Sequence, residues 1–177
     1  DFTCCVGSGM ESHAVRGDGR YYASGDTLWV KTYAPSTADW RAAGVSLTMT
    51  TSFPEGEDAA LTIGTTKPRR FTVALRRPFW AGEGFSVEVN GKAVKDPGPA
   101  GSYVRILRKW RIGDRVELVL PKTLHLEPLS GAPGRAAILW GPLVLAGDLG
   151  AIPARQPRDE AVARTAAAMN VAFALIR

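Results

Sequence analysis

The chain of 177 residues has room for one ordinary domain, or for one domain with a smaller appendage. Its composition, 45% hydrophobic and 22% charged with 19 glycines and 12 prolines, excludes intrinsic disorder over residues 1–150 and indicates a turn-rich globular fold. The formal charge of +5 comes from basic residues scattered between apolar ones, which favours a solvated sheet face, so no nucleic-acid partner is expected. No apolar run reaches the roughly 20 residues that span a bilayer, so no membrane partner is expected either.

The N-terminal segment contains the only two cysteines, Cys4 and Cys5, side by side in DFTCCVGSGMES. We expect this segment to be short and irregular. A disulfide between neighbours would strain the peptide that joins them, so the pair is either buried as small apolar residues or part of a metal or reactive site. Two cysteines provide no disulfide framework, and they leave the cellular compartment open.

From Thr27 onward, apolar and polar residues alternate with the period of two that is typical of half-buried strands. In each segment the apolar set is expected to face the core: Leu28 and Val30, then Val45, Leu47 and Met49, then Phe71, Val73 and Leu75, then Phe85, Val87 and Val89. The predicted strands are TLWVKTYA (27–34), VSLTMTTSF (45–53), FTVALRR (71–77), FSVEVNG (85–91), SYVRILR (102–108) and RVELVLP (115–121).

Turn signals separate these strands. Asn90-Gly91 predicts a tight hairpin because both residues tolerate positive φ, and Gly113-Asp114 predicts a second turn. The segment RAAILWGPLVLA (135–146) is continuously apolar, which fits either one strand buried on both faces or two strands joined at Gly141-Pro142.

The fold class that follows is all-β, built from antiparallel β-sandwiches. No helical period interrupts residues 27–149. The alanine-rich segment after the proline-rich AIPARQPRD predicts a C-terminal helix from about Asp159, in a loosely attached tail of residues 151–177.

Few side chains could carry chemistry besides the cysteine pair. Asp26 and Asp114 lie in Gly-Asp turns, where capping of the backbone is the ordinary role. His125 is expected on the polar side of a strand edge. Glu11, His13 and Asp18 are candidates because they follow the cysteines closely. Neither histidine has standard zinc-finger spacing from the pair, so a zinc site would take part of its ligands from elsewhere.

The stretch from FTCCVGSGMES to STADW resembles the end of the catalytic domain of glycoside hydrolase family 127, the β-L-arabinofuranosidase family. Later stretches resemble the family in the same order: FPEGEDAALTI, FTVALRRPFWA, FSVEVNGKAV, GSYVRILRKWRIGDRVELVLP and AAILWGPLVLAGDLG. The likeness covers residues 1–150 and rests on the double cysteine, the R-x-P-x-W stretch, Val-Asn-Gly and Gly-Pro-Leu-Val-Leu-Ala. The loop CCVGSGMES lacks the asparagine-containing turn of characterised members.

The resemblance implies a zinc-dependent retaining glycosidase. Cys4 would be the nucleophile and a zinc ligand, and Cys5 a second zinc ligand. The other ligands and a glutamate acid/base would lie upstream, in a helical barrel that acts as partner to this chain. The carbohydrate substrate would carry terminal L-arabinofuranosyl or related sugars.

The resemblance over residues 1–150 and the different composition of the last residues predict a division of the chain. Residues 1–26 would end the helical-barrel domain, residues 27–120 would form a middle β-sandwich, residues 121–150 would start or belong to a further β-sandwich element, and residues 151–177 would form the tail. The alternative is a non-catalytic module that supports a catalytic domain or binds carbohydrate on aromatics such as Trp40, Trp80 or Trp110.

Overall fold

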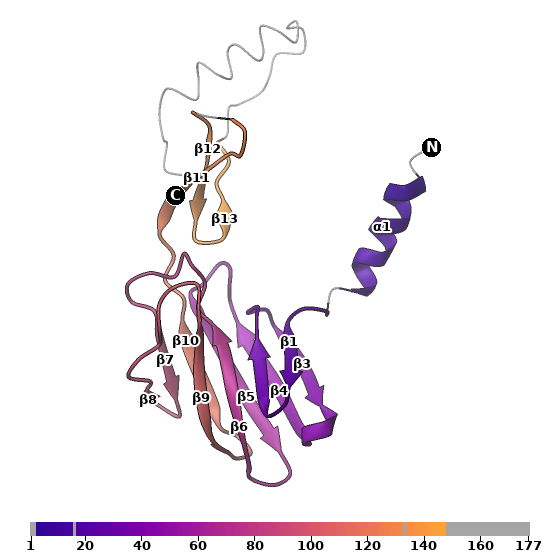
Figure 1. Cartoon of the computed structure of the whole chain (residues 1–177), viewed down its shortest axis with the longest axis vertical. Coiled ribbons are helices and arrows are strands. Elements are labelled where there is room, and N and C mark those ends of the chain that lie inside the picture. Colours follow the sequence, from indigo (N-terminus) through magenta and orange to yellow (C-terminus); the bar gives the residue numbers. More distant parts are fainter. Residues whose placement is uncertain (1–2, 16, 133, 148–177) are drawn as a thin grey trace, which may run out of the picture. The chain divides into compact units, whose positions relative to one another are not determined.

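The computed structural model describes residues 3–15, 17–132 and 134–147 (Figure 1). The chain divides into two compact units, Asp1–His125 with Trp140–Leu143, and Leu126–Leu139 with Val144–Arg177. None of the helices in the described ranges is long and apolar enough to cross a membrane.

Two sheets make up most of the first unit (Figure 1). The four-stranded sheet has the order β1-β2-β6-β9, with strands Tyr21–Ser24, Thr27–Val30, Arg69–Arg76 and Tyr103–Trp110. The six-stranded sheet has the order β3-β4-β5-β10-β7-β8, with strands Ser36–Trp40, Val45–Thr51, Asp58–Thr65, Arg115–Val119, Ser86–Val89 and Lys92–Ala93. A 3-10 turn, η1, at Arg41–Ala43 joins β3 to β4.

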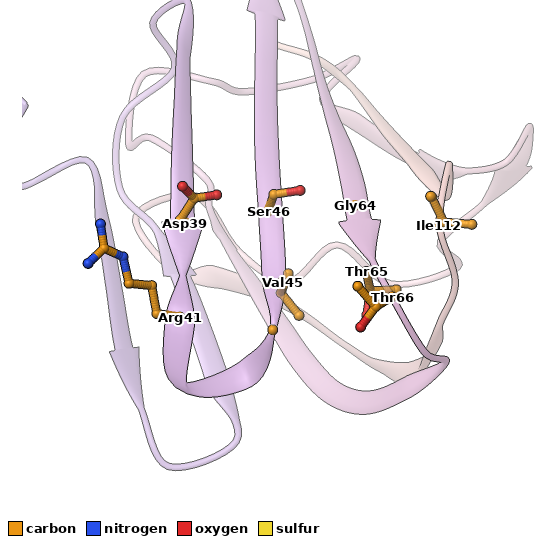
Figure 2. A pocket seen from close by; sticks show the side chains of 9 residues that line it. Asp39, Arg41, Val45, Ser46, Gly64, Thr65, Thr66 and Ile112 are labelled. Atoms are coloured by element: carbon orange, nitrogen blue, oxygen red, sulfur yellow. The ribbon is translucent and has the colours of Figure 1, made fainter.

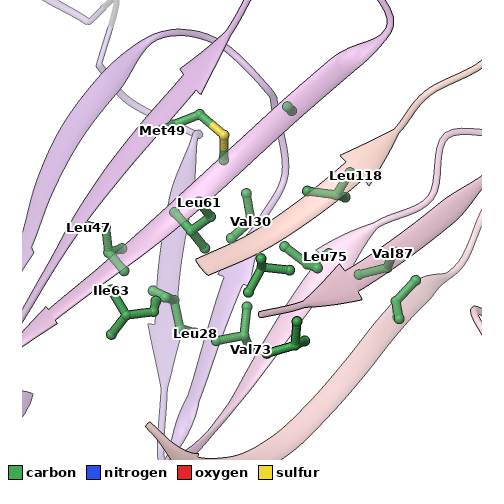
Figure 3. Packing of buried hydrophobic residues seen from close by; sticks show 14 of the residues in the cluster. Leu28, Val30, Leu47, Met49, Leu61, Ile63, Val73, Leu75, Val87 and Leu118 are labelled. Atoms are coloured by element: carbon green, nitrogen blue, oxygen red, sulfur yellow. The ribbon is translucent and has the colours of Figure 1, made fainter. Parts of the chain in front are cut away.

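The hydrophobic core gathers the inward side chains of both sheets (Figure 3). Leu28 and Val73 come from the four-stranded sheet, while Leu47 and Ile63 come from the six-stranded one, and all four are almost fully buried. Every apolar residue that the alternation assigned to the inside from the four best-defined segments is buried, which confirms a β-sandwich.

The Asn90-Gly91 hairpin is confirmed. Both residues have positive φ, 51° and 73°, and they connect β7 to β8 with Val89 opposite Lys92. The apolar segment 135–146 forms two strands rather than one. β12 (Ala136–Trp140) and β13 (Leu143–Val144) are separated by Gly141-Pro142. These two strands and β11 (Leu124–Pro128) form a three-stranded sheet.

Arg77, at the start of the RRPFWA stretch, ties two loops to the end of β6. Its guanidinium donates hydrogen bonds to the carbonyls of Ala81, Gly82 and Gly98, and it stacks over the ring of Phe85 at 4.8 Å from the centroid. Arg77, the second arginine of RRPFWA, therefore has a structural role, since its planar group of donors satisfies three carbonyls at once.

The N-terminal segment differs from the irregular conformation that the sequence predicted. Helix α1 covers Thr3–Ala14. No proline interrupts this segment, and two glycines within it weaken a helix without preventing one. The apolar period of a helix was missing from the sequence because the side chains described for α1 are all exposed.

Further differences concern strands and their direction. β1, β3 and β5 were not predicted, and β2 pairs with β6 in parallel inside an otherwise antiparallel sandwich. The predicted helix from Asp159 and the tail of residues 151–177 lie outside the described residues, and the division of the chain into domains stays a prediction.

Candidate functional site

The cysteine pair lies in the first turn of α1. Cys5 is exposed, and of Cys4 the structure describes the backbone. Glu11, which is also exposed, lies seven residues after Cys4, a rise of about 10 Å along the helix. The helix thus places Glu11 about two turns from the cysteine pair.

The two cysteines are suitable ligands for zinc, but two ligands are too few for a zinc site. Thiolates are preferred zinc ligands, and a zinc site takes at least three protein ligands. Within the ranges that the structure describes, no group of three or more His, Cys, Asp or Glu side chains could hold a metal ion. The described part of the chain thus does not complete a zinc site.

The remaining candidates are structural or isolated. Asp18 and Asp26 are exposed turn residues, and the Asp26 carbonyl accepts a hydrogen bond from Thr72 N–H. The side chain of His13 lies outside the described set. His125 is at the start of β11, with Nδ1 3.3 Å from the Thr123 carbonyl oxygen and its ring edge-on to Phe79. These contacts of Asp26 and His125 are with residues other than the cysteines.

Asp114 has the capping role that its turn predicted. Its carboxylate accepts hydrogen bonds from Arg111 N–H and Asn90 Nδ2, both at 2.8 Å, and Arg108 lies 3.4 Å away. Burial opposes ionisation of this carboxyl, but the hydrogen bonds from Asn90 and Arg111 and the charges of Arg108 and Arg111 outweigh it and lower the pKa of Asp114.

Because of this network, the free energy of unfolding depends on pH. Because the pKa of Asp114 is lower in the folded than in the unfolded chain, its contribution is complete above the usual carboxyl pKa of about 4 and is lost as the pH falls through the lowered value. Asp114→Asn is expected to cost about 1–3 kcal/mol at pH 7 and to flatten the loss of stability below pH 4, as measured by urea unfolding at a series of pH values. The exposed turn residue provides the control, since Asp26→Asn should change stability by less than about 0.5 kcal/mol. An unchanged acid profile in Asp114→Asn would contradict the assignment.

An open hollow of the described structure lies at the ends of β3, β4 and β5 (Figure 2). Its volume is about 450 Å³, Asp39 and Arg41 provide its charged groups, and Ser46, Thr65 and Thr66 provide its hydroxyl groups. A glycosidase that uses two carboxyl groups places them about 5 Å or more apart across the scissile bond. With one carboxylate among its lining residues, this hollow does not form such a site.

The tryptophans considered as a sugar platform pack in or against the core. Trp110 is fully buried, and its indole N–H donates a hydrogen bond to the Phe71 carbonyl. Trp40 is partly buried and lies edge-on to Phe71, while Trp80 stacks on Phe53 with a centroid distance of 5.7 Å. They do not form the coplanar, exposed pair that a platform needs.

Sequence reasoning missed how the basic residues are distributed. The four strands of the β1-β2-β6-β9 sheet contain six Arg or Lys and no Asp or Glu, whereas the strands of the six-stranded sheet contain four acidic and two basic residues. The signal was present in the sequence as KPRRFTVALRR and SYVRILRKW, but the partner strands were unknown. The positive charge is therefore concentrated on one sheet.

Comparison with known proteins identifies the fold. Residues 27–122 match the family model described as β-L-arabinofuranosidase, GH127 middle domain. No curated protein sequence matches the chain.

Three solved structures are similar over most of the chain. Ara127N, a GH127 β-L-arabinofuranosidase from Geobacillus stearothermophilus T6, is 28% identical over 80% of this chain and 23% of its own, with a TM-score of 0.67. A second structure, a glycoside hydrolase, is 25% identical over 81% of this chain and 25% of its own, with a TM-score of 0.72. The GH127 β-arabinofuranosidase BT3674 is 26% identical over 71% of this chain and 23% of its own, with a TM-score of 0.62. The chain thus spans about a quarter of the length of these structures. Since the family model covers more than half of the chain, the chain belongs to the GH127 β-L-arabinofuranosidase family, with residues 27–122 as its middle domain.

Proposed function

We propose that the chain is part of a zinc-dependent retaining glycoside hydrolase that cleaves terminal L-arabinofuranosyl or related linkages. The observation that carries the proposal is the match of residues 27–122 to the GH127 middle domain. Two of the similar structures are described as arabinofuranosidases, and the sandwich core of this chain has their fold. The β-sandwich would support a helical-barrel catalytic domain, since the hollow at the ends of β3, β4 and β5 lacks a pair of carboxyl groups.

In this proposal the Cys4 sulfur is the nucleophile. Its thiolate attacks the anomeric carbon, the bond from that carbon to the leaving oxygen breaks, and a glutamate outside this chain protonates the oxygen. The same glutamate then takes a proton from water, whose oxygen attacks the anomeric carbon and releases the Cys4 thiolate. Two displacements at one carbon restore the original configuration.

Cys4 and Cys5 would hold zinc together with ligands that precede Asp1 in the full-length protein. Zinc bound to a thiol keeps it deprotonated, which is the state that a sulfur nucleophile requires. In this proposal the two thiolates would come from neighbouring residues in the first turn of α1.

The activity is testable on the full-length protein that contains this chain. It is expected to release p-nitrophenol from p-nitrophenyl β-L-arabinofuranoside, and the 177-residue chain alone is expected to release none. The α-L-arabinofuranoside serves as the control for anomer specificity, and nuclear magnetic resonance of the first product should show retained configuration. Failure on every β-L-arabinofuranoside tested, or an inverted product, would contradict the proposal.

A further inference from the structure

We propose that the outer face of the β1-β2-β6-β9 sheet binds an anionic saccharide chain that carries uronate carboxylates. Five cations project from this face, which is called the basic face below: Lys31, Arg70, Arg76, Arg105 and Lys109. All five are exposed. The inference adds a ligand to the middle domain and does not depend on the nucleophile or on zinc.

The register of the strands places these cations next to one another. Arg70 lies opposite Lys109, and Ala74 lies between Trp29 on one side and Arg105 on the other. Because Ala74 carries a methyl group alone, Arg105 can reach across it, and its guanidinium lies 5.3 Å from the centroid of the Trp29 ring. Ala74 is fully buried beneath this pair, which indicates a packed surface layer.

Aromatic rings line the same face. Trp29 meets Tyr103 edge-on with a centroid distance of 4.9 Å, and the ammonium of Lys31 lies 5.0 Å from the centroid of Tyr22, whose side chain is about half exposed. A guanidinium that stacks on an indole keeps its N–H donors in the plane of the group, where they can bind a carboxylate with two parallel hydrogen bonds. Aromatic rings add apolar contact area for the C–H faces of sugars.

No described carboxylate forms an ion pair with these five cations. The two ion pairs among the described residues are Arg108–Asp114 and Arg115–Glu117, and neither involves the basic face. With no acidic residue in any of its four strands, the sheet attracts anions.

The class of ligand follows from the positive charge of the basic face, its sheet surface and the family to which the chain belongs. The basic face is an open sheet surface, so an extended polymer can lie along it, and carboxylates at intervals would meet successive cations. A saccharide is favoured over other polyanions because the chain belongs to a glycoside hydrolase family, whose substrates are saccharides.

The test measures binding of the 177-residue chain to immobilised polygalacturonate, with fully methyl-esterified polygalacturonate as the uncharged form of the same polymer. Binding to the acidic form is expected, with weakening as sodium chloride rises from 50 to 500 mM. Arg105→Gln/Lys109→Gln is expected to weaken binding about tenfold, since it removes charge-assisted hydrogen bonds while keeping most of the side-chain stems.

The matched control is Lys92→Gln/Lys95→Gln, which lowers the net charge equally at two exposed residues outside the basic face and should bind like the parent chain. If Arg105→Gln/Lys109→Gln unfolds, as judged by circular dichroism, Arg70→Gln/Arg76→Gln takes its place. Equal weakening in the control, equal binding of the esterified polymer, or tighter binding of poly-L-glutamate or single-stranded DNA than of polygalacturonate would overturn the proposal. Hydrolysis is not measured, so the outcome is independent of the arabinofuranosidase activity.

Discussion

Cys4→Ser is expected to lower hydrolysis of β-L-arabinofuranosides by the full-length protein at least about a thousandfold. A serine hydroxyl is far less acidic than a thiol and is not ionised at neutral pH, so it would not attack the anomeric carbon. The measurement is kcat/KM with p-nitrophenyl β-L-arabinofuranoside. A slowly reacting 2-deoxy-2-fluoro sugar should add one glycosyl mass to the peptide that contains Cys4, and none in the variant.

Two control variants distinguish loss of the nucleophile from other effects of a substitution in the same helix. Ser8→Ala changes an exposed residue of the same helix and should leave activity unchanged. Cys5→Ser should lower the zinc content and the activity together, since it removes one proposed ligand without removing the attacking sulfur. Full activity in Cys4→Ser, or a glycosyl adduct on another residue, would refute the assignment of Cys4.

Trp110→Ala is expected to destabilise the sandwich by about 3–5 kcal/mol, the usual cost of removing a large aromatic side chain from a core. Trp110 is fully buried, its ring packs at 5.8 Å from that of Phe71, and its N–H binds the Phe71 carbonyl at 3.0 Å. The loss is a large part of a typical domain stability of about 5–15 kcal/mol. Urea unfolding followed by far-ultraviolet circular dichroism measures it.

An exposed tryptophan provides the comparison for this substitution. Trp140 is 37% exposed, so Trp140→Ala should cost much less than Trp110→Ala. Trp110→Phe keeps most of the apolar volume but leaves the Phe71 carbonyl without its donor, so its cost should fall between the two. Similar losses for Trp110→Ala and Trp140→Ala would contradict the central place of Trp110 in the core.

The alternating segments predicted the sandwich well because each has one buried and one solvated face. β5 was missed for a physical reason: its buried residues include Ala59 and Ala60, and Gly64 lies beneath the side chain of Ser46. Alanine and glycine have low strand propensity, yet small residues are what a closely approached strand requires. The parallel pairing of β2 with β6 was equally hidden, because pairing between distant strands depends on the whole topology.

For the candidate site, sequence reasoning identified the cysteine pair but not its local structure. The side chains described for α1 are exposed, and the sequence has no apolar period that would mark this helix. The basic face was visible as separate runs of Arg and Lys, but its meaning depended on knowing that β6 and β9 are neighbours and that their sheet holds no acid.

The position of β1 has a practical consequence for anyone who shortens this protein. The family model begins at residue 27, but Tyr21–Ser24 pair along the whole length of β2. A version that starts at Thr27 would leave β2 as an uncovered edge, with unpaired N–H and C=O groups open to pairing with other chains. A soluble middle-domain preparation should therefore begin ahead of Tyr21, outside the boundary that the family model gives.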